Sequence, residues 1–166
     1  MRVVLQKVKS ASVKVNDQVV SSIGPGLLLL VGIRTDDVDS NSDYFVRKCL
    51  SLRLWSDESN PNSSNPWKLS VKEKDFEIMV VSQFTLYGHV KNGSKPDFHN
   101  AMKGKDALII FNEMVEKFKK SHNPDKIKTG CFGEEMEVSL VNDGPVTLIL
   151  ENNSKSDVSS DRSSVA

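Results

Sequence analysis

The sequence predicts an α/β protein of the α+β type, in which an antiparallel, barrel-like sheet packs against two main helices. Three observations indicate this class. Short runs at both ends of the chain alternate apolar and polar residues, as half-buried strands do. The run Leu27 to Ile33 is apolar on both faces, which is typical of a central strand. Two internal segments repeat apolar residues at helical spacing.

The first part of the chain predicts an antiparallel meander. The alternation in MRVVLQKV and again in SASVKV predicts two strands, and a turn at Asn16-Asp17 leads into a third, Gln18 to Ile23. Gly24-Pro25-Gly26 then turns into the central run. Because the connections are short, we expect these strands to pair antiparallel.

Two helices follow. Asp39-Ser40 can cap a helix that ends near Leu50, before a short strand in LRLW. A longer amphipathic helix spans about Lys105 to Lys120 and stops at His122-Asn123-Pro124. Between them, the segment Ser56 to Pro66 has the composition of an exposed loop.

The stretch Met136 to Glu151 predicts a hairpin, because alternating runs flank Asn142-Asp143-Gly144-Pro145 and Asp-Gly is a strong turn signal. Pro supplies no N–H to a ladder, so we expect something other than strand pairing to require the Gly-Pro dipeptide. Glu77 to Tyr87, EIMVVSQFTLY, similarly runs from a buried strand into the small polar residues of SQFT.

Length and composition indicate one domain, residues 1–151, followed by a serine-rich tail, residues 152–166, that we expect to be disordered. The net charge is zero, which argues against a uniformly cationic nucleic-acid-binding surface. Basic residues nevertheless concentrate in 1–16 and in 89–128. Such clusters suit moderate contact with a phosphate backbone, or form an ordinary solvated surface.

The remaining composition predicts a soluble, cytoplasmic chain without metal or membrane contact. Cys49 and Cys131 lie far apart, which favours free thiols of a reducing compartment. No apolar run is long enough to span a bilayer, and the start lacks the features of a signal peptide. The three histidines share no zinc-ligand spacing.

The residues alone leave the chemistry open. Ser82 or Thr85 could act as a nucleophile, but no motif supplies the necessary base, and both equally suit a strand end that satisfies nearby backbone. Backbone N–H groups there could form an oxyanion hole. Asp143 could be a general base or a turn residue. Four aromatic residues could stack on a nucleotide base or belong to the core: Phe84, Tyr87, Phe98 and Phe132.

Two motifs, Ser82 to Leu86 (SQFTL) and Asn142 to Thr147 (NDGPVT), resemble the signatures of the D-aminoacyl-tRNA deacylases. The similarity extends over roughly residues 1 to 151, through MRVVLQKV, ASVKV, KCLSLRLW, KPDF and TGCFGEEMEVSL. Segment 56–66 and the tail lie outside it.

The resemblance implies a homodimeric esterase that needs no cofactor and removes D-amino acids, and glycine, from the 3′-terminal adenosine of tRNA. It assigns catalysis to Ser82, Gln83, Phe84 and Thr85, with amides near Phe84 and Thr85 polarising the carbonyl and the substrate's 2′-hydroxyl assisting attack. Gly144-Pro145, with a cis bond, would enter the partner's pocket and exclude L-amino acids. Ala107, Phe132, Met136 and Asn142 are assigned to substrate binding.

Lys7 departs from the family pattern, which commonly has an arginine there that braces the Gly-Pro segment. Lysine is a single point donor and lacks the planar fork of arginine. Two alternatives to the deacylase stand: a non-catalytic nucleic-acid-binding module of the same fold, and a general esterase with Thr85 as nucleophile.

Overall fold

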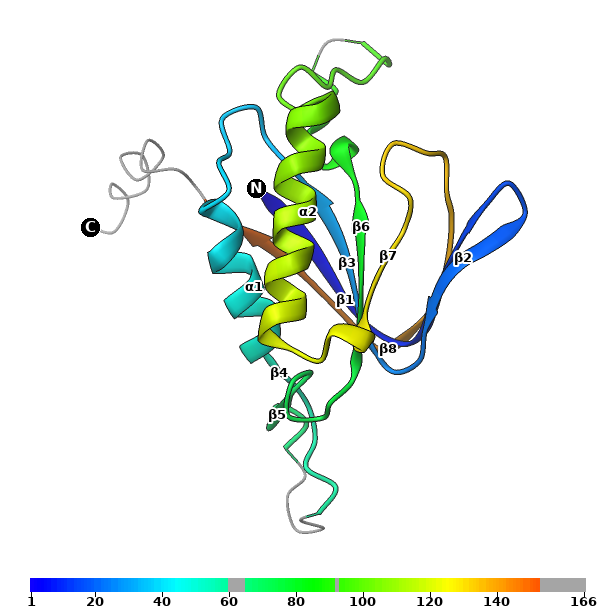
Figure 1. Ribbon diagram of the computed structural model, residues 1–166, viewed down its shortest axis with the longest axis vertical. Coiled ribbons are helices and arrows are strands. Elements are labelled where there is room, and N and C mark those ends of the chain that lie inside the picture. The colour runs from blue at the N-terminus through cyan, green and yellow to red at the C-terminus, as the bar shows by residue number, and fades with distance from the viewer. Residues whose placement is uncertain (60–64, 92, 153–166) are drawn as a thin grey trace.

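The computed structural model describes residues 1–59, 65–91 and 93–152 (Figure 1). One six-stranded sheet contains β1 (Arg2–Val15), β2 (Gln18–Ile23), β3 (Gly26–Gly32), β6 (Glu77–Ser82), β7 (Ile127–Thr129) and β8 (Glu137–Glu151). A second, two-stranded sheet contains β4 (Arg53–Trp55) and β5 (Leu69–Ser70). The helices are α1 (Asn41–Ser51) and α2 (Gly104–Ser121), with short 3-10 turns η1 (Phe84–Tyr87) and η2 (Pro124–Lys126).

The main sheet is mixed, so the expectation of an antiparallel sheet was wrong. Its strand order is β2-β1-β3-β6-β7, with β8 on the other edge of β1. β3 pairs parallel with β6, and β6 pairs parallel with β7. The connection from β3 to β6 contains α1, and the one from β6 to β7 contains α2. Such crossovers return the chain in the same direction, which a short turn cannot do.

The opening meander is simpler than the sequence indicated, because its first two predicted strands are one continuous strand, β1. β1 pairs with β3 through residues 2–8 and with β2 through residues 11–15, both antiparallel. The turn at Asn16-Asp17 is confirmed, with both residues at positive φ.

The predicted hairpin in 136–151 is also wrong, since β8 runs as one strand along β1. Its two alternating runs pair with different parts of the same partner: Asn142 lies opposite Val8, and Thr147 lies opposite Gln6. Residues 143–146 therefore face the single residue Lys7, as an enlarged β-bulge. The fourteen-residue length of β1 gives both runs a partner, so no reversal is needed.

The sheet curls into a nearly closed barrel. Its two end strands in the order, β2 and β7, are linked by the Ser21 hydroxyl, which donates to the Thr129 carbonyl at 2.7 Å. One core cluster lies on one face of the sheet: Val8, Ala11, Val13, Ile23, Leu28, Met79 and Val81. The larger core on the other face includes Leu27 and Leu29 of β3 and the buried side chains of both helices, which lie on the same side of the sheet (Figure 1).

The helix predictions are confirmed to within a residue or two. Ser40 is the N-cap residue of α1, although its side chain makes no capping bond, and His122 ends α2. Cys49 is buried in the core as a free thiol, and burial raises its pKa to about 12. Cys131 is also free and is half-buried.

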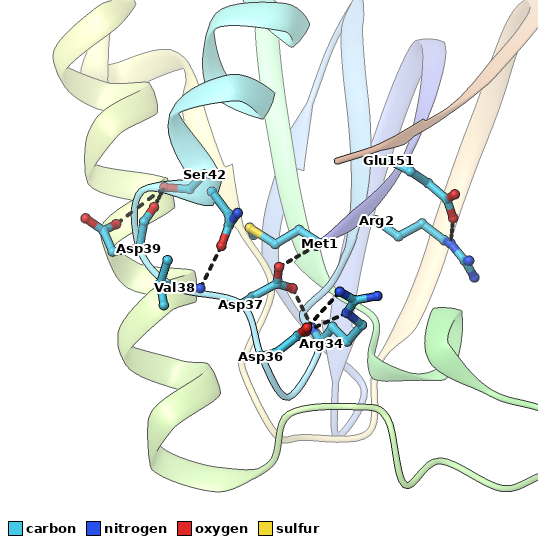
Figure 2. A network of polar contacts seen from close by, with 10 residues as sticks. Met1, Arg2, Arg34, Asp36, Asp37, Val38, Asp39, Ser42 and Glu151 are labelled. Atoms are coloured by element: carbon cyan, nitrogen blue, oxygen red, sulfur yellow. Dashed lines mark hydrogen bonds and ion pairs between the residues drawn. The ribbon is translucent and has the colours of Figure 1, made fainter. Parts of the chain in front are cut away.

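A buried ion pair fixes the loop between β3 and α1 (Figure 2). The ammonium group of Met1 lies 2.6 Å from Asp37 Oδ1, and Asp37 Oδ2 accepts from the Arg34 amide at 2.6 Å. Both oxygens of this buried carboxylate are therefore bonded, which offsets much of the cost of its burial. The start of β1 and the loop after β3 are held together by this carboxylate.

The predicted tail lies almost wholly outside the described residues, as do residues 60–64 of the predicted 56–66 loop. In the described chain, no helix has the length and apolar character that crossing a membrane requires.

Gly26 should be the least replaceable glycine of the sheet. A Cβ atom there would lie 1.8 Å from the Glu77 carbonyl oxygen, whereas one at Gly24 would meet only the Glu77 side chain at 3.4 Å. We expect Gly26→Ala to lower the free energy of unfolding by about 2 kcal/mol or more, with Gly24→Ala as the matched control. Urea unfolding measures both, and equal small losses would contradict this close approach.

Candidate functional site

The SQFT segment forms a tight turn packed directly on β3. The Gln83 amide donates to the Val31 carbonyl at 2.8 Å, and the chain then enters η1. Gly32 makes this packing possible, because a Cβ there would lie 2.9 Å from Leu86 Cβ and 3.2 Å from the Gln83 carbonyl oxygen. The absence of a side chain at Gly32 thus sets how closely η1 approaches the sheet.

Arg2 fixes the far end of η1. Its guanidinium donates to the Leu86 carbonyl and to Glu151, and it lies 5.1 Å from the centre of the Tyr87 ring. Tyr87 is buried, and its desolvation raises the pKa of the phenol to about 12. Figure 2 shows the pair of Arg2 with the last residue of β8. One side chain therefore joins β1 and the end of β8 to η1.

A cavity of about 380 Å³ opens beside η1. Its floor is the end of β3 and β6, and one wall is the first turn of α2, with Gly104 and Ala107. It is largely apolar and is lined by Val31, Ile33, Ser82, Gln83, Phe84, Phe98, Ala101, Met102, Lys103, Gly104, Ala107, Phe132 and Gly133. Five of the residues assigned from the sequence thus come together: Ser82, Gln83, Phe84, Ala107 and Phe132.

Aromatic rings form two sides of this cavity. Phe84 is 56% exposed and meets Phe98 edge-on, with ring centres 5.1 Å apart. Phe132 packs on Phe111 of α2 at 5.5 Å. Of the four aromatic residues left open between core and ligand stacking, Tyr87 belongs to the buried interior, whereas Phe84, Phe98 and Phe132 border the cavity. Flat apolar walls of this kind accept the face of a nucleotide base.

Thr85 has an amide as its partner rather than a base. Its hydroxyl accepts from Gln83 Nε2 at 2.5 Å, and the side chain is exposed. The amides of Phe84 and Thr85 lie in the first turn of η1, where N–H groups have no acceptor within the helix. The site therefore offers backbone donors at a strand end, as an oxyanion hole requires. Nowhere in the described chain do three His, Cys, Asp or Glu side chains gather in a metal-binding group.

The Gly144-Pro145 dipeptide lies elsewhere in the chain. Its peptide bond is cis, and it belongs to the bulge of β8, where Pro145 is exposed. Lys7 Nζ lies 3.2 Å from Asp143 Oδ2 and 5.4 Å from the centre of the Trp55 ring. The bulge therefore lies toward β4, at the opposite end of the sheet from η1 (Figure 1).

The separation follows from the register. Val3 of β1 lies opposite Val31, whose partner in β6 is Ser82, whereas the bulge lies beside Lys7. Val3 to Lys7 spans about 13 Å at the usual rise of a strand. Within one chain, the dipeptide thus stands well away from the cavity.

Met136 and Asn142 also lie apart from the cavity lining. The Met136 sulfur packs over Gly130, where a Cβ would approach it to 2.6 Å, beside the core cluster that contains Val13. Asn142 is exposed and pairs with Val8 next to the bulge. In the single chain these two residues do not join the group around η1.

Other contributors to the site were not predicted, among them Ala101, Met102 and Arg2. Met102 and Ala101 line the cavity because the β-bridge between Arg34 and Ala101 holds their segment beside β3. Arg2 stood out only as one of several basic residues near the start. Its contact with η1 joins residues 84 positions apart, and no local pattern reports such a pair.

Comparison with known proteins identifies the class. The sequence and the fold are those of the D-aminoacyl-tRNA deacylases, which are hydrolases of ester bonds. A family model described as D-Tyr-tRNA(Tyr) deacylase matches residues 4–151, and the chain belongs to this family.

Individual relatives agree with this assignment. A D-aminoacyl-tRNA deacylase of Drosophila melanogaster is 47% identical over 95% of this chain and 96% of its own length. One of Saccharomyces cerevisiae is 47% identical over 91% and 98%, and one of Plasmodium falciparum is 42% identical over 91% and 95%.

Two solved structures share the fold. One, named "c-Myc DNA Unwinding Element Binding Protein", has a TM-score of 0.85 and 43% identity over 93% of this chain and all of its own. The other, described as a probable eukaryotic D-amino acid tRNA deacylase, has a TM-score of 0.75. At 19% identity over 90% of this chain and 97% of its own, the second supports the fold alone.

The buried phenol of Tyr87 predicts a loss of stability at high pH. Its folded pKa of about 12 lies above the ordinary value of 10.0, so the unfolded chain releases this proton first. Stability should therefore fall as the pH rises from about 10 toward 12. Tyr87→Phe should flatten this part of the stability curve, measured by urea unfolding, and Tyr44→Phe is the control. An unchanged curve in Tyr87→Phe would contradict the burial of the phenol.

Proposed function

We propose that this chain hydrolyses D-aminoacyl-tRNA in the cavity beside η1, with the 3′-terminal adenosine between the aromatic walls and the ester at the amides of Phe84 and Thr85. The observation that carries the proposal is the meeting of the SQFT turn and the apolar cavity in a family of deacylases. The cavity is large enough for a nucleoside, at about 380 Å³, within the usual range for small ligands.

The chemistry relies on positioning. As the partner of Thr85 is an amide, the site supplies no activated hydroxyl. Backbone donors at the start of η1 stabilise the oxyanion that forms when the ester carbonyl is attacked. The substrate's own 2′-hydroxyl assists the attacking water, so the protein chiefly holds the ester in place and excludes alternatives.

A second copy of the chain completes the site. β8 pairs with β1 alone among the described strands, and none of its side chains is buried. Val141 and Ile149 are 54% and 69% exposed. A long apolar edge strand of this kind is prone to association unless something covers it. We assign that role to the partner subunit, which places the Gly144-Pro145 dipeptide at the cavity of the other subunit.

The dipeptide provides chiral selection. Gly144 has φ of +124°, a conformation that side chains rarely adopt, and it brings bare backbone to the substrate. Carbonyl oxygens there leave room for a hydrogen on the α-carbon but not for the side chain of an L-amino acid. The contact of Lys7 with Asp143 steadies the bulge through a single charge. Glycine has no side chain, so glycyl-tRNA is accepted by the same site.

A second candidate function is nucleic-acid binding without catalysis. It is favoured by the relative with a TM-score of 0.85, whose name is that of a DNA-binding protein. The two functions differ in outcome, because a binding module releases its ligand unchanged.

A panel of substrates separates the candidates. We expect hydrolysis of D-aminoacyl-tRNA and glycyl-tRNA, little hydrolysis of L-aminoacyl-tRNA, and none of a simple amino-acid methyl ester. Thr85→Ala should retain most of its turnover, because the hydroxyl takes no covalent part. An acyl adduct on Thr85, or activity on the simple ester, would support the general esterase, and binding without cleavage would support the binding module.

The partner's role is tested by Ile149→Lys. A charge at this exposed position of β8 should dissociate the dimer in sedimentation measurements without unfolding the chain, and should abolish discrimination between D- and L-aminoacyl-tRNA. Val19→Lys, at an exposed apolar position of β2, should leave both unchanged. A dimer in the first variant, or a monomer with full discrimination, would refute the shared site.

A further inference from the structure

Described residues between His89 and Asn100 line a second, polar hollow directly beside the cavity. Its volume is about 310 Å³, and six residues line it: His89, Lys91, Lys95, Asp97, His99 and Asn100. Phe98, which lies between two of them, belongs instead to the cavity lining. The two hollows thus share one short stretch of backbone, and the cavity also includes Lys103 and Gly104 at the start of α2.

This segment is held in place by the backbone rather than by its lysines. His89 and Asp97 exchange amide and carbonyl bonds, both at 2.8 Å. The Thr35 amide donates to the Asn100 carbonyl at 3.0 Å. Side-chain bonds add to this, since Asn100 contacts the His89 ring at 2.8 Å. The polar hollow therefore has a defined shape next to the proposed adenosine site.

The lysine side chains at this polar hollow are positively charged and free to contact an anionic ligand. Lys91 and Lys95 line this hollow and Lys103 lines the cavity; all three are exposed, and none of them belongs to an ion pair of the described chain. The one acid that lines this hollow, Asp97, is bonded to the His99 ring at 2.7 Å and to the His99 amide at 2.8 Å. Lys117 of α2, by contrast, pairs with Asp39 and Asp43.

We propose that this polar hollow binds the phosphates of the single-stranded 3′ end of tRNA that immediately precede the terminal adenosine. The inference rests on the proposed function, which places that adenosine in the adjoining cavity. The next phosphates along the strand must then leave the cavity, and Lys91 and Lys95 line the hollow that adjoins it. Unpaired lysines gain the most from such contact, because each releases bound counterions from the nucleic acid.

The other cationic groove is less suited to this part of the substrate. It lies between α1 and α2, with Arg47, Lys72 and Lys120. Lys120 stands about 20 Å along α2 from Ala107, at the usual helical rise. It therefore serves as the control surface.

The test compares two substrates that differ only in the rest of the tRNA and its phosphates: D-aminoacyl-tRNA and D-aminoacyl-adenosine. Lys91→Ala/Lys95→Ala should lower kcat/KM for the tRNA about tenfold at physiological salt, and should reduce the slope of log kcat/KM against log salt by about 1.4. Hydrolysis of D-aminoacyl-adenosine should keep the wild-type rate. Lys72→Ala/Lys120→Ala should match wild type on both substrates.

The outcomes are separable. If wild type hydrolyses neither substrate, the proposed function fails first and the inference falls with it. If wild type is active but the Lys91/Lys95 variant keeps its rate on tRNA, or loses activity equally on both substrates, the phosphate assignment is overturned while the deacylase remains. An equal loss in the Lys72/Lys120 control would also overturn it. Circular dichroism confirms that each variant is folded.

Discussion

The structure depends on the pairing of β1 with strands on both of its edges. One edge sets the register of β3 and, through Val31, the position of Gln83 at the start of η1. The other edge carries β8, and the residue opposite the bulge is Lys7 of β1 itself. A slip of one residue along β1 would turn every side chain to the wrong face, and would displace both motifs together. The two signature segments are thus positioned by a strand that contains neither.

The SQFT and NDGPVT motifs lie at opposite ends of the sheet within one chain. A strand paired on both edges could have carried the Gly-Pro dipeptide into the core, but β8 holds it in a bulge on an open edge. The cavity, in turn, is walled by η1, α2 and the segment around Phe132, and contains no part of that bulge. Each chain therefore presents a pocket at one end of the sheet and a projecting dipeptide at the other, which suits reciprocal use by two copies.

Local patterns in the sequence predicted local structure well. The boundaries of α1 and α2, the turn at Asn16-Asp17 and the buried central strand all follow from spacing and turn chemistry, which act over a few residues. The direction of β6 was not predicted, because the residue pattern of a strand is the same in parallel and antiparallel pairing. The crossover through α1 determines the direction. The Asp-Gly signal was misleading for a related reason: a bulge and a hairpin use the same residues, and the length of β1 selects between them.

The site residues show the same contrast between what local motifs predict and what distant contacts decide. The SQFT and NDGPVT motifs and the candidates Ala107 and Phe132 came from family resemblance, and the structure places Ser82, Gln83 and Phe84 of the first motif with both candidates around one cavity. The contacts of Arg2 with η1 and of Asp37 with the Met1 ammonium join distant residues, so no window of the sequence contains them.

The contrast between the two cysteines offers a practical consequence. Cys49 is sealed in the core with its thiol protonated at any ordinary pH, whereas Cys131 is partly open to solvent and adjoins Phe132 of the cavity wall. A thiol-reactive fluorophore added to the native chain is thereby directed to a single position, since only the thiolate form reacts and it must be reached by the reagent. The chain thus carries its own attachment point for an optical reporter beside the pocket, and occupancy can be followed in real time without engineering a new cysteine.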